Sequence, residues 1–403
     1  MALKARLRFG LEPNVALLFW AMFFLQAAFG TSDRFKTLYI ESLGAKPALV
    51  GVILGVAEAI RLFFLIASGP LSDRFSPRLL INCRWLAVAN ALVFLLAVHW
   101  WQLFPAFLFQ ATANLAWPSI SRVIDESGDE STRARRFLMV YAIAPGVPLL
   151  LAPLLGGVLA ERIGLRSVFA VLTVGLAISG VFFSKVRPVS RPGRATSGGY
   201  LAVARYRPTL LLCALASAGL FSGYLGLTLA PNYLHHERGL SIGAVGAVGA
   251  AVAAGSIGIA LAIARIPALG RSLNGTLLTF GLLPIVFVLL LLGGSIATVT
   301  VAYLCWGMAS VGQQTVYSAV GEVTPPHIRT RAFALLEVAF SAGIMLAGFA
   351  SGALYGLRPV LPLWVALGGS LIVVCATFAV RRSVLAWQRA QPSPALDAPL
   401  AAA

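Results

Sequence analysis

Ionisable side chains stand in the middle of long apolar runs of this sequence. Asp33 and Arg34 fall in the first run, and Glu58 and Arg61 fall in the second, roughly 16 and 12 Å before its end at Gly69 by the helical rise of about 1.5 Å per residue. In a bilayer each such group costs roughly 2.5–3.5 kcal/mol, so charges retained there mark pathways or buried pairs. We expect the four to form one neutral cluster, in which Asp33 or Glu58 exchanges an arginine partner for a proton or an arginine binds an anionic group. A static ion pair is the alternative, because Glu58 and Arg61 are three residues apart and can satisfy each other.

A further acid, Glu337, lies in a later apolar run and has no basic residue within four positions on either side. It is therefore a second candidate for accepting a proton. The alternative is that its carboxylate reaches the interface at the end of its helix and has no functional role there.

The apolar runs dominate the composition. Of 403 residues, 59% are hydrophobic and 11% are charged, whereas soluble proteins carry roughly 25% charged residues. An ordinary soluble enzyme is excluded, and the sequence predicts an all-α polytopic membrane protein. At about 20 apolar residues per crossing, twelve transmembrane helices are expected, near 14–40, 47–69, 79–98, 103–124, 136–160, 164–185, 209–234, 241–264, 273–293, 296–320, 331–356 and 359–380.

The net charge of +17 has a topological explanation. With both termini cytoplasmic, 23 of the 31 Lys and Arg residues fall on the cytoplasmic side, which is the usual bias of membrane proteins. The basic charge therefore predicts orientation in a plasma (bacterial inner) membrane and contact with the lipid bilayer, and nucleic acid is not an expected partner. Between the two sets of six spans, the segment 187–208 is basic and rich in Pro and Gly. It predicts a cytoplasmic linker between bundles at 1–186 and 209–382, with a short cytoplasmic tail at 383–403.

The two sets of spans repeat each other. Glu126, six residues and Arg133-x-Arg-x-Phe are echoed by Glu322, six residues and Arg329-x-Arg-x-Phe, at an offset of 196 residues. A second echo, around Gly156 and Gly352, has nearly the same offset. The chain is therefore expected to be a duplicated six-helix unit with two pseudo-symmetric bundles.

The loop after the second span carries a motif. Gly69-x-Leu71-x-Asp73-Arg74, followed by Arg78, resembles the signature loop of the major facilitator superfamily, although Ser76 and Pro77 replace a usual glycine and basic residue. In a duplicated twelve-span protein the resemblance covers nearly the whole chain, and it indicates no subfamily. It implies that this loop is a cytoplasmic gating latch. A loop that serves only to orient the chain is the alternative.

The resemblance also implies a central cavity lined by the first, fourth, seventh and tenth spans. Polar or aromatic residues inside these spans are expected to contact a substrate, or else to form hydrogen bonds between helices or packing contacts. These candidates are Gln26, Asn114, Trp117, Tyr224, Asn232, Gln313, Gln314 and Tyr317.

These features together predict a secondary active transporter of a small organic solute that works by alternating access. Proton coupling is expected, and export is favoured over import by resemblance alone. The alternatives are a proton-coupled importer of an organic anion or aromatic acid, and a transport-inactive membrane sensor or scaffold. We expect no enzyme activity, no cofactor and no metal, since His235-His236 is typical of an interfacial turn and no phosphate-binding Gly-x-x-x-x-Gly-Lys-Ser/Thr motif occurs. The protein is expected to be a monomer.

Overall fold

The structure, a computed structural model, describes residues 11–127, 133–187, 203, 206–266, 272–325 and 328–390. Every regular element in this part of the chain is a helix. This is what an apolar chain in lipid requires, because a helix satisfies its backbone hydrogen bonds within one segment. The side chains at 68–74, the linker centre at 188–202 and the terminal segments 1–10 and 391–403 lie outside the description.

In the described residues of the first half, fourteen helical pieces form a bundle. In chain order they are α2 (Pro13–Ser32), η1 (Asp33–Phe35), α3 (Lys36–Ser42), α4 (Pro47–Arg74), α5 (Pro77–Asn82), α6 (Trp85–Leu96), η2 (Trp100–Leu103), α7 (Phe104–Ala113), η3 (Asn114–Ala116), α8 (Trp117–Glu126), α9 (Arg133–Leu138), the π-helical turn η5 (Met139–Ile143), α10 (Ala144–Arg162) and α11 (Leu165–Ser184).

The second half forms a matching bundle. Its helices are α13 (Arg207–Leu227), α14 (Ala230–His236), α15 (Ile242–Arg265), α17 (Ser272–Gly281), α18 (Leu283–Leu292), α19 (Ile296–Ser310), α20 (Gly312–Val323), α21 (Arg329–Leu357) and α22 (Leu361–Ala390).

Eleven helices in the described residues are long and apolar enough to cross a membrane. The one remaining predicted span, the fourth at 103–124, is also helical, but it is divided into α7, η3 and α8. Two helices extend beyond their predicted ends: α4 continues through Arg74, so the Gly69–Arg74 part of the motif is helical, and α22 continues to Ala390.

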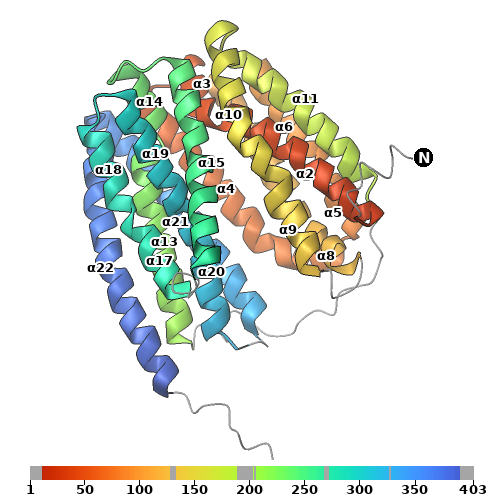
Figure 1. Cartoon of the computed structure of the whole chain (residues 1–403). Helices are drawn as coiled ribbons and strands as arrows, with labels where there is room; N and C mark the ends of the chain where they lie inside the picture. Colours follow the sequence, from red (N-terminus) through yellow and green to blue (C-terminus); the bar gives the residue numbers. More distant parts are fainter. Residues whose placement is uncertain are drawn as a thin grey trace, which may run out of the picture.

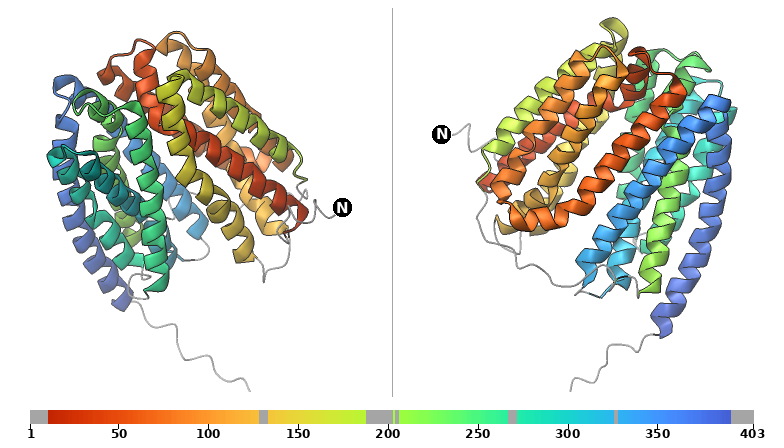
Figure 2. Two further views of the ribbon diagram at one scale, coloured as in Figure 1. Left: turned by 45° about the horizontal axis from the view of Figure 1, so that its top comes forward. Right: turned by 180° about the vertical axis from the view of Figure 1, so that it is seen from behind.

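The two bundles stand side by side (Figure 1). They touch mainly through two helix pairs, α4 against α21 and α10 against α15. Both pairs are closest near the end of the molecule that holds α3 and α14, which we call the closed end. There a Cβ on Gly51 would lie 2.5 Å from the Cα of Gly352, and a Cβ on Gly246 would lie 2.6 Å from the Cα of Gly157. Toward the opposite end, where α2 begins and α22 finishes, the ribbons of the bundles separate (Figure 2).

Helices break at corresponding places in the two bundles. The first span breaks at η1 and the seventh between Leu227 and Ala230, while the fourth breaks at η3 and the tenth at Val311. Each pair of breaks is about 196 residues apart, the offset of the sequence repeat. The duplication inferred from the sequence is therefore visible in the irregularities of the helices as well as in their number.

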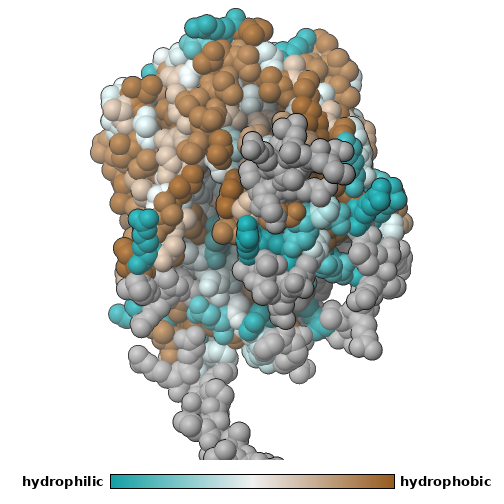
Figure 3. Space-filling model, turned by 45° about the vertical axis from the view of Figure 1, so that its right-hand side comes forward, coloured by the Kyte–Doolittle hydropathy of each residue, from teal (hydrophilic) through white to brown (hydrophobic). Residues whose placement is uncertain are grey.

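Large apolar side chains cover the outside of the bundles. Phe63, Leu155 and Ile372 are 70%, 61% and 71% exposed, and hydrophobic residues form a broad brown surface in the space-filling view (Figure 3). Teal hydrophilic residues gather at the top and in the lower part of that view. An exposed apolar belt between polar ends is the surface that a bilayer requires.

Candidate functional site

Two pockets lie along the boundary between the bundles. The central pocket has a volume of about 410 Å³ and is lined by residues of both halves. The second, which we call the inner pocket, has a volume of about 400 Å³ and lies against α4, α7, η3 and α8, with Glu337 of α21 on its far side. Pockets of a few hundred Å³ are the usual size for small-molecule sites.

The first-half wall of the central pocket carries its charges. Asp33 and Arg34 come from η1, Lys36 from the start of α3, and Glu58 from the middle of α4. The 3₁₀ turn η1 interrupts the first span at this depth, so Asp33 and Lys36, three residues apart, both reach the pocket. Asp33 is exposed to it, while Arg34 and Lys36 are half-buried. Three of the four residues of the predicted cluster therefore line one pocket.

The second-half wall is aromatic and apolar. The rings of Tyr224 and Trp306 meet edge to face with centres 5.8 Å apart. Leu227, Val252 and Ile344 extend this wall. The neighbouring hydroxyls bond their own helices, since Thr228 Oγ1 donates to the carbonyl of Tyr224 at 2.6 Å and Ser310 Oγ donates to that of Gly307 at 2.7 Å.

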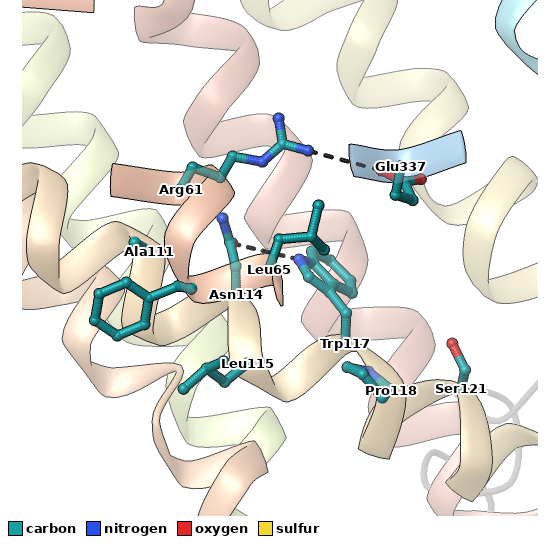
Figure 4. A pocket seen from close by; sticks show the side chains of 10 residues that line it. Arg61, Leu65, Ala111, Asn114, Leu115, Trp117, Pro118, Ser121 and Glu337 are labelled. Carbon is teal, nitrogen blue, oxygen red and sulfur yellow. Dashed lines mark hydrogen bonds and ion pairs between the residues drawn. The ribbon is translucent and has the colours of Figure 1, made fainter. Parts of the chain in front are cut away.

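Arg61 connects the two bundles. Its Nη1 lies 2.7 Å from Oε1 of Glu58 in its own half, and its Nη2 lies 3.8 Å from Oε2 of Glu337 in the other half. Figure 4 shows the Arg61 side chain pointing toward Glu337 across the inner pocket. The hydroxyl of Tyr317 donates to the other oxygen of Glu337. Glu337, which has no basic neighbour in sequence, thus finds its cation in the other bundle.

The floor of the inner pocket is built around the helix break η3. Asn114 Oδ1 accepts from Trp117 Nε1 and from Gln110 Nε2, both at 3.3 Å, and Figure 4 shows the Asn114–Trp117 pair beside Arg61. Because the Trp117 amide donates to the carbonyl of Asn114 in the 3₁₀ turn, the carbonyl of Ala113 accepts instead from Arg84 Nη1 at 3.3 Å.

Arg84 stabilises this floor through its contacts with Ala113 and Trp117. Its side chain is buried, at 2% exposure, and its guanidinium lies 5.0 Å from the Trp117 ring centre and 5.6 Å from that of Phe183. Such cation–π contacts offset part of the cost of a buried cation. Its Nε and Nη2 have no hydrogen-bond partner within the described part of the chain.

Several predicted substrate residues lie away from both pockets. Asn232 is fully buried at the closed end, where its Nδ2 donates to Glu41 Oε2 at 2.5 Å. His236 Nε2 lies 2.9 Å from Oε1 of the same carboxylate. These contacts join α14 to α3 and help to close that end.

Three predicted glutamine contacts also lie outside the residues that line the two pockets. Gln26 is half-buried on α2 and Gln313 is half-buried on α20. Gln314, oriented so that its nitrogen donates, reaches the carbonyls of Ser310 and Val311 at 3.3 and 3.1 Å. It therefore stabilises the break in the tenth span, whereas Asn114, Trp117 and Tyr224 do line pockets.

The repeated loop residues occupy matching places. Glu126 ends α8 and Arg133 begins α9, while Glu322 lies near the end of α20 and Arg329 begins α21. Glu126 pairs with Arg122 at 2.7 Å, and Arg329 Nε lies 3.4 Å from the carbonyl of Thr324. Of the gating motif, the side chains of Gly69, Leu71, Asp73 and Arg74 fall outside the described residues, and Arg78 is exposed on α5.

Sequence reasoning missed three residues of these pockets: Lys36, Trp306 and Arg84. Lys36 is three residues from Asp33, a spacing that indicates a shared helix face and could have added it to the predicted cluster. Trp306 is an aromatic residue of the tenth span, so its type and its span were the signal that could have identified it. Arg84 lies near the start of the predicted span 79–98, where a cation is readily taken for one at the membrane interface, and no pattern in the sequence reveals that it is buried.

Comparisons with known proteins agree with this architecture. The family model of the Major Facilitator Superfamily matches residues 15–320. The crystal structure of the POT family transporter PepTSo superposes with a TM-score of 0.76 at 12% identity, over 94% of this chain and 99% of that one. A mutant of the peptide transporter POT in complex with sulfate gives 0.74 at 13% identity, over 93% and 96%.

A mutant of the nucleoside transporter NupG gives a TM-score of 0.73 at 15% identity, over 91% of this chain and 99% of that one. Among curated protein sequences, none matches this chain significantly. Identities this low establish a shared fold and carry no information on the solute.

Proposed function

Because the chain belongs to the Major Facilitator Superfamily of secondary transporters, we propose that it carries a small organic solute through the central pocket by alternating access and that protons drive the cycle. Membership in this family makes it a multi-pass membrane transporter and not an enzyme. The solute class, the coupling ion and the direction of transport are the proposed parts. One observation carries the proposal of proton coupling, the position of Arg61 between the carboxylates of two different bundles.

The ion-pair geometry supports proton coupling. Arg61 is held at 2.7 Å by Glu58 of its own bundle and at 3.8 Å by Glu337 of the other. A proton on Glu337 removes the attraction between the bundles but leaves the Glu58–Arg61 pair in place. A proton on Glu58 instead frees Arg61 to turn toward Glu337. Proton binding therefore changes how strongly the bundles hold each other, which is the link that alternating access needs.

The distribution of basic residues supports an orientation. The end where α2 begins and α22 finishes holds most of the Lys and Arg residues, so we place it in the cytoplasm of a plasma (bacterial inner) membrane. The closed end then faces outward, and both pockets are reached from the cytoplasm. In this arrangement the predicted latch at Gly69–Arg78 lies on the cytoplasmic side, and a monomer suffices because a single chain supplies both walls of the central pocket.

Export and import make different demands on the site. A proton-driven exporter needs proton and solute to exclude each other, so solute binding weakens as pH falls. A proton-driven importer needs them to bind together, so binding strengthens as pH falls. The pH dependence of affinity therefore decides between the predicted export and the alternative of anion import.

The test uses the full chain in proteoliposomes that contain a pH-sensitive dye. We expect the transported solute to drive proton movement in the wild type. Glu337→Gln should retain solute exchange without a pH gradient and lose most of the associated proton movement. The side chain at this position can then no longer take up a proton, so the strength of its contact with Arg61 no longer changes with pH. Glu237→Gln, on an exposed carboxylate of the closed end, is the matched control and should remain coupled. Full coupling in both Glu337→Gln and Glu58→Gln would contradict the proposal.

A further inference from the structure

The central pocket holds two cations for which the described part of the chain offers no ion-pair partner. Arg34 and Lys36 both line it. The ion pairs of the described residues include Glu58 with Arg61, but none with Arg34, Lys36 or Asp33. A cation kept at the depth of a membrane without a carboxylate in contact is costly unless a ligand compensates it.

Arg34 is held in a fixed place by the other bundle. A Cβ on Gly249 of α15 would lie 3.0 Å from Cγ and 3.5 Å from Cδ of Arg34. The aliphatic part of the arginine side chain therefore packs against α15 at a position that has no side chain. Its guanidinium lies within electrostatic range of Tyr224 and Tyr303 of the second half. The planar guanidinium suits a carboxylate, which it can bind through two parallel hydrogen bonds.

Lys36 approaches the pocket from the first bundle. Its Nζ lies 5.4 Å from the ring centre of Phe94 and 5.5 Å from that of Phe107. The negative faces of these rings stabilise the ammonium only in part. It remains within electrostatic range of Asp33 and Glu58, but Glu58 is already paired with Arg61 at 2.7 Å.

The two walls of the pocket differ in chemistry. Arg34, Lys36 and Asp33 stand on the first-half wall, while Tyr224 and Trp306 form an aromatic surface on the second-half wall. A ligand that satisfies both walls carries its charge at one end and an apolar or aromatic body at the other.

We propose that the solute is a small organic monoanion, a carboxylate with an apolar or aromatic body, whose carboxylate binds Arg34 and Lys36, and that one proton is taken up with it. This inference rests on the proposed transport function and names the solute class for the same site. Across the two pockets the acids Asp33, Glu58 and Glu337 balance the bases Arg34, Lys36 and Arg61. A monoanion together with a proton leaves this balance unchanged.

Asp33 is the acid through which the bound anion draws in the proton, and the contacts of Arg61 with Glu58 and Glu337 couple that uptake to the movement of the bundles. A bound carboxylate places a second negative charge beside Asp33, and two carboxylates in one site favour protonation of one of them. The titratable groups that share the central pocket with Asp33 are Arg34 and Lys36 on its own segment, Glu58 on α4 and Tyr224 on α13, while Arg61 of α4 lines the inner pocket. Anion and proton therefore help each other to bind, and the loaded site crosses the membrane without net charge. This co-binding favours the import alternative wherever the proton gradient points inward.

The first experiment measures thermal stabilisation of the purified full chain by benzoate, phenylacetate, phenylbutanoate and hexanoate, each compared with its primary amide, below and above neutral pH. A ligand that binds the folded state raises the melting temperature by mass action. We expect carboxylates of this panel to stabilise the protein, more strongly at the lower pH, and their neutral amides to have no effect. Equal stabilisation by the amides, or none by any carboxylate, overturns the proposal.

Variants identify the site. Arg34→Gln and Lys36→Gln should each weaken carboxylate binding roughly tenfold or more, since each removes a charge-assisted hydrogen bond. Arg162→Gln and Lys46→Gln, on exposed cations outside both pockets, are the matched controls and should bind as the wild type does. Asp33→Asn should bind carboxylate with an affinity that no longer varies with pH. Unchanged affinity in Arg34→Gln refutes the assignment. If Arg34→Gln does not fold, Gly249→Val, which displaces the arginine stem, replaces it with the same expectation.

Flux separates this inference from the proposed function. In proteoliposomes the carboxylate should move with one proton, at a rate that an imposed potassium diffusion potential does not change. Proton-coupled flux of a neutral or cationic solute would leave the transporter in place and overturn the anion assignment. Carboxylate binding without flux in any gradient would leave the anion site in place and overturn the transport function.

Discussion

Gly51 of α4 packs against Gly348 and Gly352 of α21, and we call this contact the glycine seam. It makes the equilibrium between conformations with the closed end shut and open sensitive to a single methyl group. A Cβ on Gly51 would lie 2.5 Å from both the Cα and the N of Gly352, and 2.9 Å from the carbonyl oxygen of Gly348. Ordinary contacts of a Cβ begin at 3.4 Å, and backbone atoms cannot rotate away as a side chain can. In Gly51→Ala the two helices must therefore separate by about 1 Å at the closed end.

The size of the effect follows from that separation. Overpacking of this kind costs about 1–3 kcal/mol, and the cost falls on the conformation in which the seam is closed. The population with this end open should rise by roughly 5- to 150-fold relative to the closed one. Gly258→Ala, where nothing lies within 4 Å of the added methyl group, is the matched control. It should gain up to about 1 kcal/mol of helix propensity and leave the equilibrium unchanged.

The assay is a spin-label distance measurement across the seam. Labels at Lys46→Cys and Arg358→Cys occupy exposed positions just before α4 and just after α21. Gly51→Ala should shift the distance distribution to longer values, and Gly258→Ala should reproduce the wild type. A wild-type distribution in Gly51→Ala, combined with raised thermal stability like that of the control, would show that the helices are not in backbone contact there.

Other substitutions test single contacts. Gly156→Ala, whose Cβ would lie 2.2 Å from the carbonyl oxygen of Thr31 inside one bundle, should lower the free energy of unfolding by about 1–3 kcal/mol without the change in label distance expected for Gly51→Ala. Arg84→Met should alter the fluorescence of Trp117, because the Ala113 carbonyl loses its donor and the indole loses its cation; an unchanged emission spectrum would contradict the supporting role of Arg84. Tyr39→Phe removes a buried bond of 2.6 Å to the Phe94 carbonyl and should cost about 1 kcal/mol in thermal unfolding, whereas a more stable variant would contradict this. Glu41→Gln weakens the contacts to Asn232 and His236 and should lengthen the Lys46–Arg358 label distance, which would stay constant if these contacts do not hold the closed end.

Hydropathy and repetition were sufficient to predict most of the fold. The all-helical fold and the superfamily are confirmed, and eleven of the twelve predicted spans are helices long and apolar enough to cross a membrane, because a bilayer imposes a length and a composition on every crossing. The residues at which helices end were harder to predict from the sequence. Arg74 and Ala390 extend their helices past the apolar runs, since a helix can continue into water without any apolar signal.

The candidate site was predictable only where its partners are close in sequence. The spacing of three anticipated the contact between Glu58 and Arg61, which forms at 2.7 Å. The contact between Arg61 and Glu337 joins different bundles, so no local pattern contains it. Asn232 has the residue type and the span of a substrate contact, yet its depth along the span places it at the closed end beside Glu41. The assigned roles in coupling and solute binding stay predictions.

The broken fourth span has a consequence for biogenesis. Its pieces α7 and α8 have ten residues each, about half the length that crosses a hydrocarbon core alone, and α8 carries Arg122, Asp125 and Glu126. Such a segment is a poor substrate for insertion as an independent helix. It is stabilised within the bilayer only after the third span has delivered Arg84 to the freed carbonyl of Ala113. The floor of the inner pocket is therefore expected to be among the last parts of the first bundle to be completed during synthesis. Mutations there should appear first as reduced yield of inserted protein and only secondarily as altered transport.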